Sequence, residues 1–145
     1  EMYDLTLKSL PVDVAIFSAA VADYKIENIE KNKIKKKETI DLKLRKNVDI
    51  LSHISNHNSL RPKIVIGFAA ETLDLAENSK KKLLEKNCDW IIANDVSDKS
   101  IGFDSDFNEI SVFTKESHTH FQKASKNLLA VQLINMLSKN NQSIH

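Results

Sequence analysis

The sequence of 145 residues is poor in cysteine, glycine and arginine. Its one cysteine, Cys88, excludes an internal disulfide and is typical of a protein that folds in a reducing compartment. Its two glycines, Gly67 and Gly102, are far fewer than the ~7% of residues that is average, and they exclude a glycine-rich phosphate-binding loop. Because 19 lysines accompany only 2 arginines, an anion would be held by ammonium groups rather than by bidentate guanidinium forks.

Long apolar runs and an excess of charge are missing as well. No run approaches the ~18 residues of a membrane helix, and the N-terminus lacks the pattern of a signal peptide. The net charge of +1 argues against a nucleic-acid partner recognised by bulk charge. With 41% hydrophobic and 28% charged residues, we expect a globular cytoplasmic domain with no membrane and no nucleic-acid partner.

Apolar runs predict the strands. Residues 12–20, 63–70 and 89–94 read as buried strands of the kind that helices cover on both faces, and residues 109–114 read as a fourth strand after a polar loop. Strands that alternate with helices along the chain indicate a parallel α/β sheet with right-handed crossovers.

Helical periodicity predicts the elements between the strands. The chain begins in what reads as the tail of a helix, residues 1–10, and a short helix with Asn47 as its N-cap is expected over residues 47–58. A longer helix is expected over 72–86, and another over 126–137 before a frayed end at 140–145. The inner faces expected for these two helices are Leu73, Ala76, Leu83 and Leu84, and Leu128, Leu129, Leu133 and Leu137.

Residues 31–44 break this rhythm and are expected to form a β-arm. A lysine cluster is followed by Ile40, Leu42 and Leu44, which alternate with polar residues as in a half-exposed strand or hairpin. The cluster is open to three interpretations: a solvated strand edge that resists aggregation, an RNA or nuclear-localisation patch, or an anion site. Its lysines are Lys31, Lys33, Lys35, Lys36 and Lys37.

Small and polar residues follow the three buried strands, at 18–23, 67–72 and 93–96. Ligands of parallel sheets bind beyond the carboxyl ends of the strands, so Asp23, Glu71 and Asn94 are expected to orient a ligand in one cleft. Close packing of strand and helix followed by an N-cap would produce each segment equally well.

Other chemistry-bearing residues give weaker signals. Lys82 and Lys86 are spaced to project together from one helix, either toward an anion or into solvent. His53 and His57 share a helix face, and His118 and His120 share a strand face, but neither pair has a third ligand at metal-binding spacing. No metal site is expected in the protein itself, and Cys88 is expected to be a buried structural thiol.

Seven blocks in order resemble the phosphopantothenoylcysteine synthetase family, the ligase half of the bacterial bifunctional coenzyme A biosynthesis flavoprotein. They cover the chain from residue 1 to about residue 137. The blocks are Ala-Ala-Val-Ala-Asp-Tyr (19–24), Lys-Ile-Lys-Lys (33–36), Asn-x-Asp-Ile (47–50), Gly-Phe-Ala-Ala-Glu-Thr (67–72), Lys-x-x-x-Lys-Asn-x-Asp (82–89), Ala-Asn-Asp-Val (93–96) and Gly-Phe-x-Ser-Asp-x-Asn (102–108).

The resemblance implies a Rossmann-like three-layer sheet and CTP-dependent ligation of 4′-phosphopantothenate to cysteine. CTP would activate the carboxylate as an acyl-cytidylate, and the amine of cysteine would then displace CMP. Because the first step joins two anions, it calls for cations, which Mg²⁺ and lysines can supply. In members of the family the residue at the position of Lys33 is catalytic. These enzymes are homodimers with a flap near the active site. The implied nucleotide contacts are Phe17, Ser18, Ala19, Asp23, Lys33, Val48, Asp49, Ile50, Leu51, Phe68, Lys82 and Lys86.

The chain departs from the family pattern in two respects. Val48 stands where the family has proline. The family's first strand, glycine-rich turn and an upstream asparagine are not among these residues, nor is the flavin-binding decarboxylase half. We therefore expect residues 1–145 to form a partial CTP-binding ligase domain without flavin. The alternative is a catalytically incomplete, Rossmann-like domain that binds nucleotide without forming product.

Overall fold

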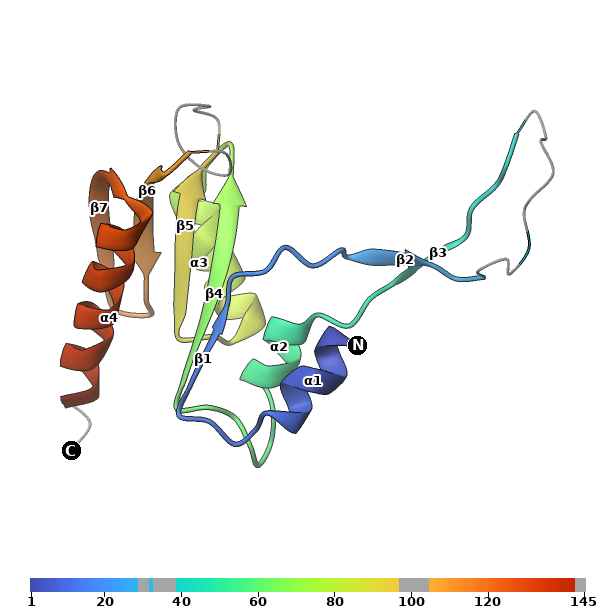
Figure 1. The fold of residues 1–145 in the computed structure, drawn as a ribbon, viewed down its shortest axis with the longest axis horizontal. Coiled ribbons are helices and arrows are strands. Elements are labelled where there is room, and N and C mark those ends of the chain that lie inside the picture. The colour runs from blue at the N-terminus through green and yellow to red at the C-terminus, as the bar shows by residue number, and fades with distance from the viewer. Residues whose placement is uncertain (29–31, 33–38, 97–104, 143–145) are drawn as a thin grey trace.

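The computed structural model describes residues 1–28, 32, 39–96 and 105–142, and shows a sheet covered by helices with a projecting arm (Figure 1). Among these residues the main sheet has the strand order β1-β4-β5-β6-β7. The strands are β1 (Val14–Phe17), β4 (Ile64–Glu71), β5 (Trp90–Asp95), β6 (Phe107–Phe113) and β7 (His118–Ser125). Strands β1, β4 and β5 are parallel, whereas β6 is antiparallel to both of its neighbours. The predicted α/β class is confirmed, with a mixed, mostly parallel sheet.

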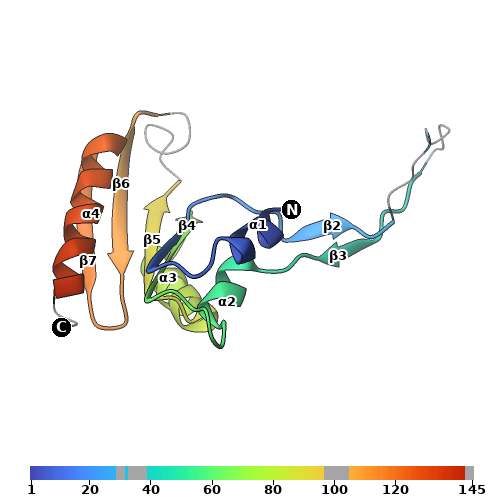
Figure 2. The same cartoon turned by 60° about the horizontal axis from the view of Figure 1, so that its bottom comes forward.

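Helices cover both faces of the sheet, which gives the expected three layers (Figures 1 and 2). On one face α4 (Lys126–Gln142) inserts Leu129 and Leu137 among side chains of β4, β5 and β6. On the other face α3 (Leu75–Lys86) and α2 (Ile50–Ser55) contribute Leu83 and Leu51. Helix α1 (Met2–Lys8) has no buried residue and lies beside α2, to which Tyr3 Oη is hydrogen-bonded through His53 Nε2 at 3.0 Å. In the described part of the chain no helix combines the length and apolarity needed to cross a membrane.

Strand β1 is shorter and more exposed than the expected buried strand over 12–20. It ends at Phe17, and within the described residues it pairs with β4 alone. The side chain of Ile16 is therefore 50% exposed at this edge of the sheet. The small residues after Phe17 leave the sheet and form the loop 18–23, which lines the candidate site.

Two helices begin later than predicted. Asp49, not Asn47, caps α2, because its carboxylate accepts the backbone N–H of Ser52 at 2.9 Å. Helix α3 begins at Leu75 rather than Thr72, and its buried residues are Ser79 and the expected Leu83. The expected inner residues Leu73, Ala76 and Leu84 are exposed, because Leu73 precedes the helix and the other two lie off the face of Ser79 and Leu83.

The C-terminal part of the chain adds a strand that was not predicted. Strand β7 pairs with β6 as a hairpin, and only the shared face of His118 and His120 was anticipated there. Helix α4 buries Leu129 and Leu137 as expected but leaves Leu128 50% exposed. The helix continues to Gln142, so residues 140–142 belong to it rather than to a frayed tail.

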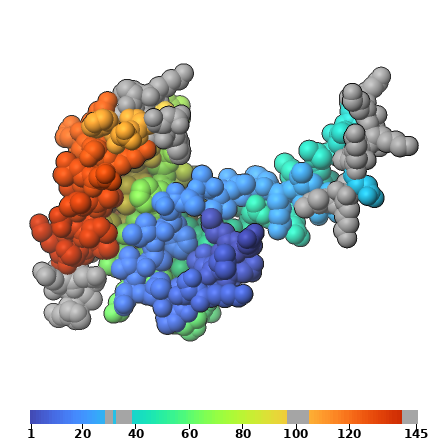
Figure 3. Space-filling view, in the orientation of Figure 1, coloured from blue at the N-terminus to red at the C-terminus, as the bar shows by residue number. Residues whose placement is uncertain are grey.

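The predicted arm is a hairpin that begins earlier than residue 31. Strands β2 (Tyr24–Ile26) and β3 (Leu44–Lys46) pair antiparallel, with Tyr24 opposite Lys46, and carry the chain away from the sheet (Figures 1 and 3). Ile40 and Leu42, expected in a strand, precede β3 and are not part of the ladder. The five clustered lysines lie outside the described residues.

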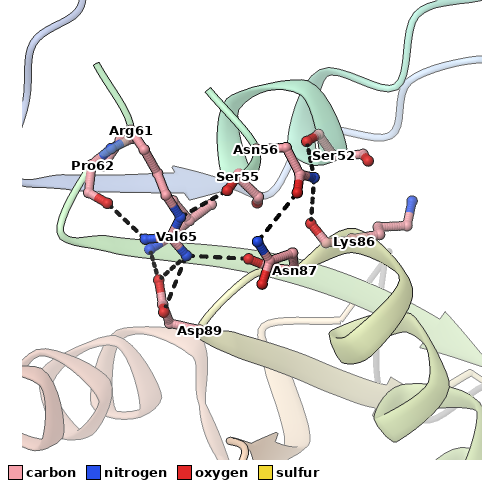
Figure 4. A network of polar contacts seen from close by, with 9 residues as sticks. All are labelled: Ser52, Ser55, Asn56, Arg61, Pro62, Val65, Lys86, Asn87 and Asp89. Carbon is pink, nitrogen blue, oxygen red and sulfur yellow. Dashed lines mark hydrogen bonds and ion pairs between the residues drawn. The ribbon is translucent and has the colours of Figure 1, made fainter. Parts of the chain in front are cut away.

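A polar network joins α2, α3 and the amino ends of β4 and β5 (Figure 4). Arg61 donates to both carboxylate oxygens of Asp89, at 3.2 and 3.0 Å, and to the backbone carbonyl of Ser55 at 2.7 Å. Asp89 also accepts the backbone N–H of Val65 at 2.7 Å. The network therefore fixes the C-terminal end of α3 against the sheet.

Candidate functional site

A cleft with a cavity volume of about 790 Å³ runs along the exposed edge of β1, from the segment before the strand to the loop beyond its carboxyl end. Its walls come from α1, β1 and the loop 18–23, from the segment 46–51 that leads into α2, and from Phe68 and the last turn of α3. Segments that are far apart in the sequence therefore meet beside β1, and the cleft includes the loop beyond the carboxyl end of this strand, where parallel α/β folds place their ligands.

Asn47 holds the loop 18–23 in place. Its side-chain amide donates to the carbonyl of Ala22 at 2.8 Å, and its backbone N–H donates to the carbonyl of Asp23 at 2.7 Å. The small side chains of this loop, Ala19, Ala20 and Ala22, leave its backbone open to the cleft. The Asn-x-Asp-Ile block thus supplies one residue that fixes the loop and another that caps α2.

Gly67 allows α2 to approach β4 behind the cleft. A Cβ atom added at Gly67 would lie 2.5 Å from a terminal methyl group of Leu51 and 3.1 Å from one of Ile91. Any larger residue would displace Leu51, which itself lines the cleft. This glycine therefore leaves room for the Leu51 side chain, from the first turn of α2, against β4.

The structure brings most of the predicted nucleotide contacts together around this cleft. Lys82 does not line it, and Lys33 lies outside the described residues. Whether the converging residues touch a nucleotide stays a prediction. The predicted contacts that line the cleft are Phe17, Ser18, Ala19, Asp23, Val48, Asp49, Ile50, Leu51, Phe68 and Lys86.

The three strand ends do not form the single cleft that their order suggested. Asp23 lines it, but Glu71 and Asn94 do not. The register explains the difference, since Phe17 at the end of β1 lies opposite Gly67, whereas β4 and β5 continue to the pair Glu71 and Asp95. The ends of β4 and β5 therefore extend beyond the wall that β1 provides.

Each of the two described lysines predicted to meet phosphate is paired with a carboxylate. Lys82 Nζ lies 2.6 Å from Glu71 Oε1 at the end of β4, and this carboxylate is only 12% exposed. Lys86 Nζ lies 2.7 Å from Asp49 Oδ2 at the start of α2. Lys86 lines the cleft, whereas Lys82 is held one helical turn away.

Charges around the cleft nearly balance. Within the described residues, the lining contains the carboxylates of Asp23, Asp49 and Glu85 and the ammonium groups of Lys46 and Lys86. Partial burial of Asp49 raises its pKa. The hydrogen bonds from Lys86 and Ser52 and the charges of Lys86 and Lys46 outweigh that effect and lower the pKa below its ordinary value.

Sequence reasoning missed several lining residues. Asn47 was assigned to a helix cap, although its block in the sequence was the available signal. Thr6 of α1 and Ser9, the residue after this helix, line the cleft, and no pattern in the sequence distinguished them from other polar positions.

Outside the cleft, a smaller cavity and the single cysteine are weaker candidates for a functional site. A second cavity of about 180 Å³ includes Ser111 and His120, which are hydrogen-bonded at 3.1 Å, and Glu109, 3.2 Å from His120 Nε2. No three His, Cys, Asp or Glu side chains converge on a metal position in the described ranges. Cys88 is fully buried, and this burial raises its thiol pKa to about 11, which makes it an inert thiol.

Comparisons with known proteins agree on one family. The sequence matches the family described as the C-terminal domain of the DNA/pantothenate metabolism flavoprotein over residues 1–140. Coenzyme A biosynthesis bifunctional protein CoaBC of Haemophilus influenzae is 40% identical over 137 residues, which are 93% of this chain and 34% of that protein. The protein of the same name from Bacillus subtilis is 39% identical over 107 residues, 73% of this chain and 26% of that protein. The chain therefore spans about a third or less of the length of these relatives.

Solved structures give the same answer for the fold. The C-terminal domain of a coenzyme A biosynthesis bifunctional protein CoaBC superposes with a TM-score of 0.75 at 26% identity, covering 98% of this chain and 62% of that one. The DNA/pantothenate metabolism flavoprotein from Streptococcus pneumoniae superposes with a TM-score of 0.70 at 22% identity, covering 99% and 69%. Sequence and fold together place this chain in the family of the C-terminal domain of the DNA/pantothenate metabolism flavoprotein.

Proposed function

We propose that this chain serves coenzyme A biosynthesis as part of a CTP-dependent ligase that joins 4′-phosphopantothenate to cysteine. The observation that supports this proposal best is the cleft itself, because predicted nucleotide contacts from four separate segments converge on one cavity of about 790 Å³. A cavity of this size is in the range of small-molecule sites. The part of the cleft formed by the loop 18–23 lies beyond the carboxyl end of a parallel strand, where such sheets bind nucleotides.

In the proposed reaction, the substrate carboxylate attacks the α-phosphate of CTP and pyrophosphate leaves. The cysteine amine then attacks the resulting acyl-cytidylate, loses a proton and releases CMP. Since negative charge accumulates in the first transition state, the site needs an excess of cations. The described lining does not have one, so the proposal assigns further positive charge to Lys33 and to Lys82 after its release from Glu71.

Mg²⁺ fits this site as a companion of the nucleotide rather than as a resident ion. Mg²⁺ is commonly held by one or two carboxylates together with substrate phosphates, so it requires no preformed cage. Asp23 lines the cleft and has no ion-pair partner within the described ranges, so it is the carboxylate that would hold the ion. When bound, Mg²⁺ would neutralise charge on the phosphates.

The arm is proposed to cover the active site of a second subunit. Ile40, Leu42 and Leu44 are 54%, 59% and 59% exposed, which is unfavourable for an apolar stripe in water. A two-fold dimer would bury this stripe and bring the lysines of residues 31–37 to a bound triphosphate. The family resemblance supports the same arrangement.

A ligase assay on the protein in its full natural length tests the proposal. With CTP, Mg²⁺, 4′-phosphopantothenate and cysteine, we expect release of pyrophosphate and formation of the amide product. Parallel reactions with ATP test the choice of nucleotide. Binding of CTP without product would favour the alternative of a catalytically incomplete nucleotide-binding domain, and absence of CTP binding would contradict both.

A further inference from the structure

Asp49 connects two elements of the cleft through one carboxylate. Its Oδ1 accepts the backbone N–H of Ser52 at 2.9 Å and so caps α2, while its Oδ2 accepts from Lys86 Nζ at 2.7 Å. The side chains of Asp49 and Lys86 are 39% and 30% exposed, and both line the cleft. The carboxylate therefore serves the helix and the lysine with separate oxygens.

Lys86 is held at both of its ends. Its backbone carbonyl accepts from the side-chain amide of Asn56 at 3.4 Å, as part of the network that fixes the end of α3. Figure 4 shows the Lys86 side chain leading away from that network. The ammonium group at the far end of this flexible stem is fixed by Asp49.

We propose that Asp49 is a positioning residue that holds the Lys86 ammonium group at the cleft wall, ready to bind an anionic phosphate group of a nucleotide. The inference rests on the proposed function. An ammonium group has three N–H donors, so Lys86 can keep its bond to Asp49 while it donates to a phosphate oxygen. Fixing a flexible lysine before the ligand arrives lowers the entropy lost on binding.

The neighbouring lysine shows why the position of the carboxylate matters. Lys82 is also paired, but its partner Glu71 lies at the end of β4, and Lys82 does not line the cleft. Asp49 lines the cleft at the start of α2, so its pair with Lys86 keeps the ammonium group at the cavity. The ion pair with Asp49 thus holds Lys86 at the cleft, whereas the ion pair with Glu71 holds Lys82 away from it.

The experiment separates the ion pair from the helix cap. Affinity for CTP is measured by calorimetry on the full-length protein and on Asp49→Asn, Asp49→Ser and Asp49→Ala. Asparagine and serine cap a helix about as well as aspartate, but neither forms the ion pair with Lys86. We expect all three variants to bind CTP roughly fivefold to tenfold more weakly, as for loss of a charge-assisted hydrogen bond.

A double mutant and a matched control complete the test. Lys86→Met should weaken binding as well, and adding Asp49→Asn to it should cause little further loss, because the two groups act as one unit. Asp13→Asn removes the same charge from an exposed pair, Asp13 with Lys63 at 2.9 Å, beside the amino end of β1. This control should leave the affinity for CTP unchanged.

The outcomes distinguish the inference from the function on which it rests. If the parent protein does not bind CTP, the proposed function fails and takes the inference with it. If the parent binds CTP and Asp49→Asn binds equally well or more tightly, only the positioning role is overturned. Weaker binding confined to Asp49→Ala would also overturn it, because the cap alone would then explain the effect.

Discussion

Substitution of the lysine proposed to meet the phosphates of CTP is the most direct test of the proposed reaction. Lys33→Gln removes a charge that the proposed transition state needs more than bound CTP does. We expect kcat for acyl-cytidylate formation to fall by roughly 100-fold, the scale of a lost electrostatic contact, with a much smaller change in KM for CTP. Lys25→Gln, which changes an exposed lysine of β2, is the control and should have little effect. A change confined to KM would contradict the catalytic role.

Protonation of one carboxylate can be followed through stability. The pKa of Asp49 in the folded protein lies below its ordinary value of 3.8, so its ionised form is stabilised by folding. This contribution is present above pH 3.8 and is lost as the pH falls through the lower, folded-state value. Urea unfolding of the parent and of Asp49→Asn should therefore differ near neutral pH and converge in acid. A difference that persists unchanged at the lowest pH would contradict the ion-pair contribution.

At the level of elements, the hydrogen bonds of Arg61 and Asp89 connect α2 and the end of α3 to the sheet. Asp89→Ala would leave Arg61 without its carboxylate and the Val65 amide without its acceptor. We expect a loss of about 2 kcal/mol in the free energy of unfolding, because the groups left unpaired are partly buried. Asp13→Ala breaks an exposed pair and should cost at most ~1 kcal/mol. Equal effects in urea unfolding would show that the network has no special role.

Some helices and strands were predicted from the sequence far more accurately than others. Strands β4 and β5 were found almost to the residue, because their continuous apolar runs are what a buried parallel strand requires. Strand β7 was missed, since its sequence HTHFQKAS is largely polar and its pairing with β6 supplies what its composition does not. The start of α3 was misplaced because Leu73 looked like a core position, whereas the helix begins at Leu75 and Leu73 is 75% exposed.

The whole molecule explains why the site was only partly predictable. The order of strands correctly predicted that Asp23 lies at the cleft. It did not show that β4 extends beyond β1, so that Glu71 pairs with Lys82 and does not line the cleft. The lining residues of α1 come from the packing of a helix that carries no buried residue and hence no strong periodic signal. The resemblance to a family located Phe17, Phe68, Lys86 and the segment 48–51 of the lining, which the pattern of single residues did not distinguish from other positions.

At the scale of the whole molecule, the proposed role of the arm can be tested through the oligomeric state. Leu42 is 59% exposed on a segment that projects from the body, and we propose that a partner subunit covers it (Figure 3). Leu42→Asp would place a charge in that apolar interface. Light scattering should then show a dimer for the full-length parent and an affinity between subunits weakened by at least tenfold, about 1.4 kcal/mol, for the variant. Leu73→Asp changes a leucine outside the arm that is even more exposed, at 75%, and should leave the dimer intact. A monomeric parent, or a dimer indifferent to Leu42→Asp, would rule out this role, because an apolar stripe at an interface cannot accept an unpaired charge without cost.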